Sequence, residues 1–222
     1  MAELLHDLPH CTVQRVFVSD MNNAVYLITS KSSGEQILID AADDPAALLE
    51  LLGEQPRLRH IVTTHAHWDH TRATAELARA TGAQVAIGSA DAPQLEAERG
   101  VTADRLLAHG DTVHITDVSL EVIALRGHTP GSVALLLSDG DGDSDNRGDT
   151  APHILFTGDS LFPGGVGNTD NDPERFTQLF TDVTTRVFDR FGDDTVVYPG
   201  HGERTTLGAE RPHLDEWKAR GW

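Results

Sequence analysis

The feature that most constrains this chain is the run from Thr64 to His70, which reads Thr-His-Ala-His-Trp-Asp-His. It places three imidazoles and one carboxylate within six residues. Imidazole nitrogen and carboxylate oxygen are the ligands that zinc and related divalent metals use in proteins. The apolar run 58–64 before it predicts a strand, and the run 71–81, closed by Gly82, predicts a helix. The cluster is therefore expected where a strand passes into a helix.

The spacing inside this run predicts two ligand directions. On an extended segment side chains alternate, so His65 and His67 are expected to point to the same side. Asp69 and His70 follow as the backbone turns, and we expect them to aim at a second, neighbouring point. One strand end can thus serve two metal ions. A solvated histidine-rich loop is the simpler interpretation, and the further candidate ligands downstream argue against it.

Length and charge bound the remaining possibilities. The 222 residues predict a single domain over 1–222 with a substantial core. The net charge of −18 repels phosphate backbones, so no nucleic-acid partner is expected. The chain has no apolar run long enough to cross a membrane, its first ten residues do not resemble a signal peptide, and its only cysteine is Cys11. We expect a cytoplasmic protein that acts on a small molecule without a membrane partner, and the oligomeric state stays open.

The other segments follow a repeating order of strands and helices. Strands are predicted at 12–19, 24–30, 36–40, 84–87, 111–115, 120–125, 133–137, 153–157 and 195–198, and helices at 45–52, 91–99, 173–190 and 211–220. They form two similar rounds, 12–110 and 111–222, which predict two β/α layers packed face to face with helices outside. The acidic run 139–149 lacks the glycine and glutamate of a calcium loop, so we interpret it as a surface loop.

Three later motifs add candidate ligands, each in a loop after a predicted strand. His128 lies in Gly-His-Thr-Pro-Gly-Ser, Asp159 in Gly-Asp-Ser and His201 in Pro-Gly-His-Gly. The C-terminal edge of an α/β sheet is the common place for a site. A glycine next to each ligand allows the backbone to come close to a metal.

Together, His-x-His-x-Asp-His and these three motifs resemble the metallo-β-lactamase-fold hydrolases, and within them the short glyoxalase II-like (hydroxyacylglutathione hydrolase-like) branch. The motifs occur in the family's order and span almost the whole chain. The resemblance implies an α/β fold, a four-layer αβ/βα sandwich of two mixed sheets packed face to face. It also implies the ligand sets of two metals: His65, His67 and His128 for the first, Asp69, His70 and His201 for the second, and Asp159 as the bridge.

The resemblance further implies two divalent metal ions, zinc in the first place with iron or manganese also compatible. The expected chemistry is hydrolysis by a hydroxide that bridges the metals, with Asp69 and Asp159 as catalytic residues. Zinc β-lactamases need no bridging aspartate, so Asp159 argues against antibiotic hydrolysis.

The substrate remains open among three classes. The first is a small thioester, a hydroxyacyl-thiol conjugate. The second is another small ester, a lactone or an amide. The third is an oxygenase reaction at one iron, similar to that of persulfide dioxygenases. Substrate contacts are expected for Asn168, Tyr198 and Arg204, the last being a cation close to a ligand loop.

Overall fold

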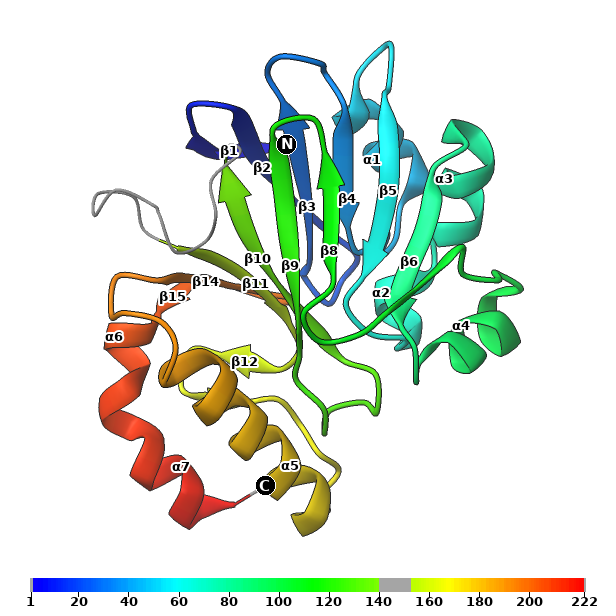
Figure 1. The fold of residues 1–222 in the computed structure, drawn as a ribbon. Helices are drawn as coiled ribbons and strands as arrows, with labels where there is room; N and C mark the ends of the chain where they lie inside the picture. Colours follow the sequence, from blue (N-terminus) through cyan, green and yellow to red (C-terminus); the bar gives the residue numbers. More distant parts are fainter. Residues whose placement is uncertain (1, 140–152, 222) are drawn as a thin grey trace.

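The computed structural model describes residues 2–139 and 153–221. In this part of the chain two β-sheets face one another, and helices cover their outer sides (Figure 1). This arrangement is the four-layer αβ/βα sandwich expected from the sequence, so the predicted fold class is confirmed. Most of the acidic run 139–149 lies outside the described residues. In the described ranges no helix is long and apolar enough to cross a membrane.

The first sheet has seven strands in chain order, β1-β2-β3-β4-β5-β6-β7. The strands are β1 (Glu3–Asp7), β2 (Cys11–Val18), β3 (Asn23–Ser30), β4 (Gln36–Ile39), β5 (Leu58–Thr63), β6 (Gln84–Gly88) and β7 (Arg105–Leu107). Strands β1 to β4 pair antiparallel, whereas β4 to β7 pair parallel. The parallel strands therefore end at one common edge of the sheet.

The second sheet has six strands in the order β15-β14-β11-β10-β9-β8. They are β8 (Thr112–Ile115), β9 (Val118–Ala124), β10 (Val133–Asp139), β11 (Ile154–Gly158), β14 (Val196–Pro199) and β15 (Thr205–Thr206), and a small hairpin adds β12 (Leu161–Phe162) and β13 (Gly165–Val166). Only β11 and β14 pair parallel in this sheet. Their C-terminal ends thus lie side by side.

An apolar layer between the two sheets holds the sandwich together. Alternate residues of each sheet point into it, as the period of a strand requires, for example Ile28 and Ile37 from one sheet and Leu135 and Phe156 from the other. These four side chains are fully buried. Burying a side chain of this size stabilises the fold by roughly 1.5–3 kcal/mol.

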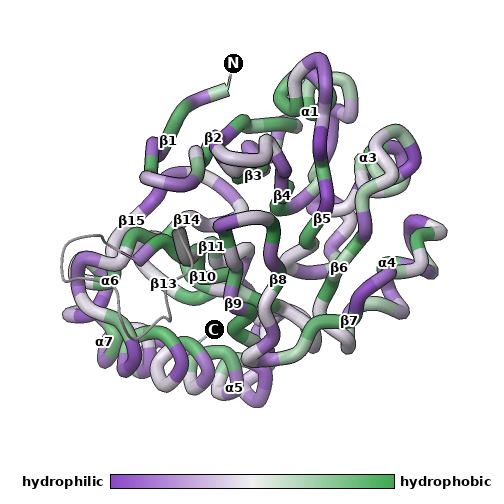
Figure 2. The backbone as a smooth tube through the Cα atoms, turned by 45° about the horizontal axis from the view of Figure 1, so that its top comes forward, coloured by the Kyte–Doolittle hydropathy of each residue, from purple (hydrophilic) through white to green (hydrophobic). Residues whose placement is uncertain are grey.

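The helices cover the outer faces. They are α1 (Pro45–Leu52), α2 (Trp68–Thr71), α3 (Thr74–Thr81), α4 (Ala92–Arg99), α5 (Pro173–Val183), α6 (Leu207–Glu210) and α7 (Leu214–Arg220). Helices α1 and α3 pack on the first sheet through Leu48 and Leu77, and α5 and α7 pack on the second through Leu179 and Trp217. Figure 2 shows α5 alternating between hydrophobic and hydrophilic turns, as expected for a helix with one buried side.

Several boundaries differ from the prediction. The helix expected over 71–81 begins only at Thr74, as α3, after the separate turn of α2, because the backbone N–H groups of Arg72 and Ala73 donate to Ala42 and Ala41 instead of joining the two helices. The helix expected over 173–190 ends at Val183 and widens into a π-helical turn, Thr184–Phe188. The edge strands β1 and β7 were not predicted from the sequence, since both are short and partly exposed and lack a clear alternating pattern.

One buried ion pair ties α5 to the second sheet. Asp182, 2% exposed, accepts hydrogen bonds from the backbone N–H, Nε and Nη2 of Arg126 at 3.0, 2.9 and 2.9 Å. Arg126 lies two residues after the end of β9 and two residues before His128. The carboxylate therefore fixes where the loop of His128 begins.

We expect Asp182→Ala to lower the free energy of unfolding by about 1–3 kcal/mol, because it removes the buried carboxylate that accepts from both the backbone N–H and the guanidinium of the half-exposed Arg126. Urea denaturation measures this change. Asp189→Ala on the same helical segment removes an exposed carboxylate and is the matched control, with an expected change within about 0.5 kcal/mol. Equal loss in both variants contradicts the assigned role of Asp182.

Candidate metal centre

Loops from both sheets bring the candidate ligands to one edge of the sandwich. His65 and His67 follow β5, and Asp69 and His70 lie in the single turn of α2. The second sheet contributes the loop of His128 between β9 and β10 and the residues that follow β11 and β14, which are Asp159 and His201. All seven predicted ligands therefore meet where the C-terminal ends of β5, β11 and β14 converge.

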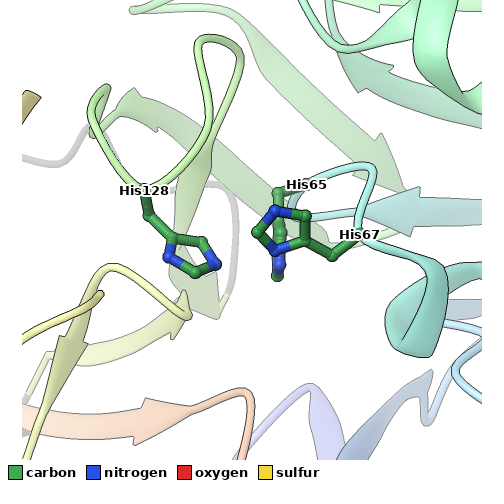
Figure 3. Close-up of side chains that lie close together, drawn as sticks. All are labelled: His65, His67 and His128. Atoms are coloured by element: carbon green, nitrogen blue, oxygen red, sulfur yellow. The ribbon is translucent and has the colours of Figure 1, made fainter. Parts of the chain in front are cut away.

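The first group consists of His65, His67 and His128, whose ligand atoms lie within 4.8 Å of one another. Figure 3 shows His128 facing the other two rings from a separate loop. The ring centroid of His128 is 4.5 Å from that of His67 and 4.8 Å from that of His65. The geometry brings together the three side chains expected for the first metal.

The second group consists of Asp69, His70 and His201, again with ligand atoms within 4.8 Å. The Nε2 atom of His201 is 3.2 Å from Asp69 Oδ2, and it is 3.1 Å from Nε2 of His70. These are the three side chains expected for the second metal.

Asp159 lies between the two groups. Its carboxylate oxygens are 3.4 Å from Nε2 of His70, 3.4 Å from Nε2 of His201 and 3.8 Å from Nε2 of His128. Gly200 makes this approach possible, because a Cβ at that position would lie 2.3 Å from Asp159 Oδ1. A metal ion bound at each group would thus lie within reach of this carboxylate, as expected for the bridging residue.

Four of the histidines are oriented by a hydrogen bond at Nδ1. His70 donates to Asp40 Oδ2 at 2.9 Å, His128 donates to the carbonyl of Asn168 at 2.7 Å and His201 donates to the carbonyl of Met21 at 3.0 Å. His65 lies 3.1 Å from Thr64 Oγ1, whose own proton is donated to Asp40. An occupied Nδ1 leaves Nε2 available for a metal, which is the usual arrangement of a metal-binding histidine.

Two of these supporting residues were missed in the sequence. Asp40 is 1% exposed and binds Thr64 and His70, so it steadies both groups of ligands. The available signal was its position directly after β4, because the candidate ligand Asp159 also directly follows a strand, β11. Asn23 donates to Asp69 Oδ2 at 3.0 Å, and no sequence pattern distinguishes this asparagine from its neighbour Asn22.

A third supporting residue, Asp91, joins the loops of the two halves. This carboxylate is 1% exposed and accepts from the backbone N–H of Ala66 at 3.0 Å, from Thr129 Oγ1 at 2.7 Å and from the backbone N–H of Gly131 at 2.6 Å. Ala66 lies between two ligands of the first sheet, and Thr129 adjoins His128. Asp91 therefore sets the separation of the side chains in the first group.

Helix α5 supports the same loop from the other side. The guanidinium of Arg175 donates to the carbonyl of Gly127 at 2.8 Å and to the carbonyl of His128 at 2.5 Å. A ligand on an otherwise irregular loop is thus held by groups on rigid elements, which is what an ordered metal site requires.

The electrostatics divide the histidines into two kinds. Burial lowers the pKa of His65 and of His128, so both are neutral at pH 7. Burial also acts to lower the pKa of His70, but the carboxylates of Asp159 and Asp40 outweigh it and raise that pKa. Burial is likewise outweighed at His201, where Asp159 and Asp69 raise the pKa to about 10. A metal at the second group therefore replaces protons that these imidazoles otherwise hold.

The donor set fits divalent metals. Nε2 of His65, Nε2 of His128 and Oδ1 of Asp159 are buried and have no hydrogen-bond partner among the described residues. Buried polar atoms are nearly always paired, so unpaired atoms of this kind call for a further partner. A cation satisfies two imidazole nitrogens and a carboxylate oxygen at once.

The three predicted substrate contacts have different surroundings. Asn168 is exposed, and its backbone carbonyl orients His128. Tyr198 is 1% exposed in the layer between the sheets, with its hydroxyl 2.8 Å from His6 Nε2. Arg204 is exposed. Burial is the main cause that lowers the pKa of His6, and the positive charge of Arg204 lowers this pKa further. The structure thus places Tyr198 in the core and leaves Arg204 at the surface.

A hollow of about 610 Å³ lies beside the second group of ligands, lined in part by Met21, Trp68 and Arg72. Trp68, next to the candidate ligand Asp69, is 43% exposed, and the guanidinium of Arg72 lies 4.1 Å over its ring. Met21, whose backbone carbonyl accepts from His201, is 49% exposed. Met21 and Trp68 give this hollow an accessible apolar part, whereas Ser19, Asp20, Asp43 and Asp44 line the rest of it.

We expect Asp91→Asn to weaken metal binding by roughly 10- to 100-fold, the usual cost of altering a group that orients ligands. The asparagine side chain keeps one oxygen that can accept a hydrogen bond. Its NH₂ group replaces the other oxygen and faces a hydrogen-bond donor of a ligand loop, which then loses its acceptor. Competition with a chromophoric chelator measures the affinity. Asp104→Asn, which alters a carboxylate bound to the backbone N–H of Val85 away from the ligand loops, is the control. Equal affinities in the two variants contradict the role given to Asp91.

Comparison with known proteins agrees with this geometry. A hydroxyacylglutathione hydrolase from Polaromonas is 32% identical over 85% of this chain and 66% of its own length. ETHE1 from Myxococcus xanthus is 28% identical with a TM-score of 0.74, covering 93% of this chain and 84% of its own. A protein solved in a di-iron-bound form is 31% identical with a TM-score of 0.67, covering 89% and 96%.

The chain spans between 55% and 66% of the length of the first three hydroxyacylglutathione hydrolases that it matches. The family model described as the metallo-beta-lactamase superfamily matches residues 19–142, which include five of the seven candidate ligands. The resemblance expected from the motifs is confirmed, and the chain belongs to the metallo-β-lactamase superfamily.

Proposed function

We propose that this protein is a hydrolase that uses two divalent metal ions and acts on a small thioester of the hydroxyacyl-thiol type. The observation that carries the proposal is the position of Asp159 between two complete groups of three ligands. The 30–35% identity to several hydroxyacylglutathione hydrolases supports the substrate class. Zinc is the metal we expect first, with iron or manganese compatible with the same ligands.

In this reaction water adds to the thioester carbonyl, and the carbon–sulfur bond breaks to give a carboxylic acid and a thiol. Metal ions at the two groups would supply an acidified water and stabilise the negative charge that develops on the carbonyl oxygen. The side chains of the protein hold this arrangement. Burial opposes ionisation of Asp159, but His70 and His201 outweigh it and keep its pKa low, so its carboxylate remains charged.

Asp69 is the second candidate for a catalytic role. Burial again opposes ionisation, whereas His201, His70 and Asn23 lower its pKa, so the carboxylate is ionised at neutral pH. An ionised carboxylate at this position can accept the proton that the attacking water loses. The hollow lined by Met21 and Trp68 lies beside this group and is the proposed place for the apolar part of the substrate.

An oxygenase reaction at a single iron is the second candidate function. The similarity to ETHE1 from Myxococcus xanthus is the observation in its favour. The third group that the structure brings together, His65, His70 and Asp159, offers two imidazoles and one carboxylate, a set that suits iron.

Two measurements separate the proposals. Elemental analysis of freshly purified protein is expected to give two metals per chain, whereas one tightly held iron favours the oxygenase. A substrate panel of a hydroxyacyl thioester, a simple ester, a lactone and a β-lactam is then assayed. We expect the thioester to have the highest kcat/KM. Similar values for the ester or lactone would replace the thioester proposal with that of a general esterase.

We expect Asp159→Ala to reduce turnover by roughly 10³-fold or more, the scale seen when a key electrostatic group is removed from an active site. Steady-state kinetics with the thioester measure this. His114→Ala, in β8 of the second sheet and outside both groups of ligands, is the control and should retain nearly full activity. Similar losses in the two variants would show that the catalytic centre lies elsewhere.

Arg204 is the proposed contact for a negatively charged thiol. It is exposed three residues after the ligand His201. We expect Arg204→Ala to raise KM for an anionic thioester while kcat stays nearly constant, because the contact acts equally in the ground and transition states. A neutral thioester of the same acyl group should show little change. Arg79→Ala, on the exposed side of α3, controls for the loss of one positive charge.

A further inference from the structure

A second hollow lies at the opposite end of β5 from the metal centre. It has a volume of about 1040 Å³ and opens between the first residues of β5, β6 and β7 and the turn from β8 to β9. Leu58 to His60, at the start of β5, line it, whereas the metal ligands follow the end of that strand. At about 3.3 Å per residue the two places are roughly 15 Å apart. The hollow is therefore separate from the metal centre.

Four basic side chains line this hollow. They come from three different strands: Arg59 and His60 from β5, Arg105 from β7 and His114 from β8. The chain as a whole carries a net charge of −18 with only 17 lysines and arginines, so a gathering of basic groups is unusual for its surface. A concave surface lined by basic groups concentrates the potential that attracts anions.

The two acidic residues of the hollow already have partners. Glu35 accepts from the backbone N–H and Oγ1 of Thr116 at 3.1 and 3.0 Å, and it lies 3.5 Å from Nε of Arg59. Asp117 accepts from Ser32 Oγ. These carboxylates are thus held at the rim by neutral donors and by a single arginine.

Arg105 has no such partner. Within the described ranges its guanidinium makes no hydrogen bond and no ion pair, although the residue is partly buried. Burial is the largest cause that lowers the pKa of the neighbouring His60, and the positive charges of Arg105 and Arg59 lower it further against an opposing hydrogen bond to the backbone of His114. The hollow thus holds two arginines and two carboxylates, and among these four groups Arg105 alone has no hydrogen bond or ion pair within the described residues.

We propose that this hollow binds an oxyanion group, a phosphate or carboxylate, of a small molecule, with Arg105 as the principal contact. A guanidinium can bind either group through two parallel hydrogen bonds. The side chains of Gln84 and Ser119 line the same hollow and supply neutral donors. The volume suits a small metabolite. The site would be distinct from the hydrolytic centre and does not depend on the substrate proposed for it.

Two-dimensional amide NMR of the metal-loaded protein tests this proposal, with inorganic phosphate and succinate titrated separately. The amides of residues 59, 60, 105, 114 and 119 should shift and saturate together. Arg105→Gln should weaken this binding by roughly tenfold or more, the expected cost of losing a charge-assisted pair. Lys218→Gln, on α7, removes an equal charge from an exposed position elsewhere and should leave the affinity unchanged.

The choice of ligand separates the two sources of the oxyanion. Saturation by phosphate alone assigns the site to a phosphorylated molecule, and saturation by succinate alone assigns it to a carboxylate. The proposal would be overturned if only the amide signals of the loops around the candidate metal ligands shifted. It would also be overturned if Arg105→Gln and the wild type bound phosphate or succinate with equal affinity. Because Arg105→Gln does not touch the metal centre, hydrolysis by this variant should be unchanged, and that result confirms that the variant is folded.

Discussion

The packing of the two sheets against one another is the constraint on which the rest of this structure depends. The first sheet carries His65, His67, Asp69 and His70 at its edge, and the second carries His128, Asp159 and His201. Neither sheet alone holds both groups of candidate ligands. The apolar layer between them therefore does more than stabilise the fold, because it fixes the distance across which the ligands meet. A shift between the sheets would separate His128 from the two other rings of its group.

The apolar layer brings the candidate ligands near one another, and buried carboxylates then fix their positions more closely. Asp40 orients ligands within the first sheet, whereas Asp91 connects the loops of both sheets. Each is almost fully buried and has several donors, so its desolvation is offset by hydrogen bonds. The same principle acts at Asp182, which positions the start of the His128 loop from α5. The metal centre is thus supported by an outer layer of acids that carries no direct ligand role.

Charge is distributed unevenly over the molecule, and this bears on both proposed sites. Acids predominate overall, and at the metal centre Asp69 and Asp159 are offset by the neighbouring imidazoles. Arg204, exposed near the centre, and Arg105, partly buried at the far end of the sandwich, therefore stand out against a negative surface. Both proposals place a negatively charged small molecule at one of these two positions.

The sequence alone determined the ligand types, their order and the fold class. Closely spaced histidines and an aspartate after an apolar strand, and candidate ligands flanked by glycine after later strands, are local patterns of the amino-acid sequence. Only the tertiary structure showed Asp40, Asn23 and Asp91 as supporting residues, because each acts on partners between 24 and 46 positions away in the chain. The burial of Tyr198, the exposure of Trp68 and the unpaired charge of Arg105 were also beyond the sequence. A side chain's neighbours across a sandwich depend on strand order and sheet packing, which local periodicity does not encode.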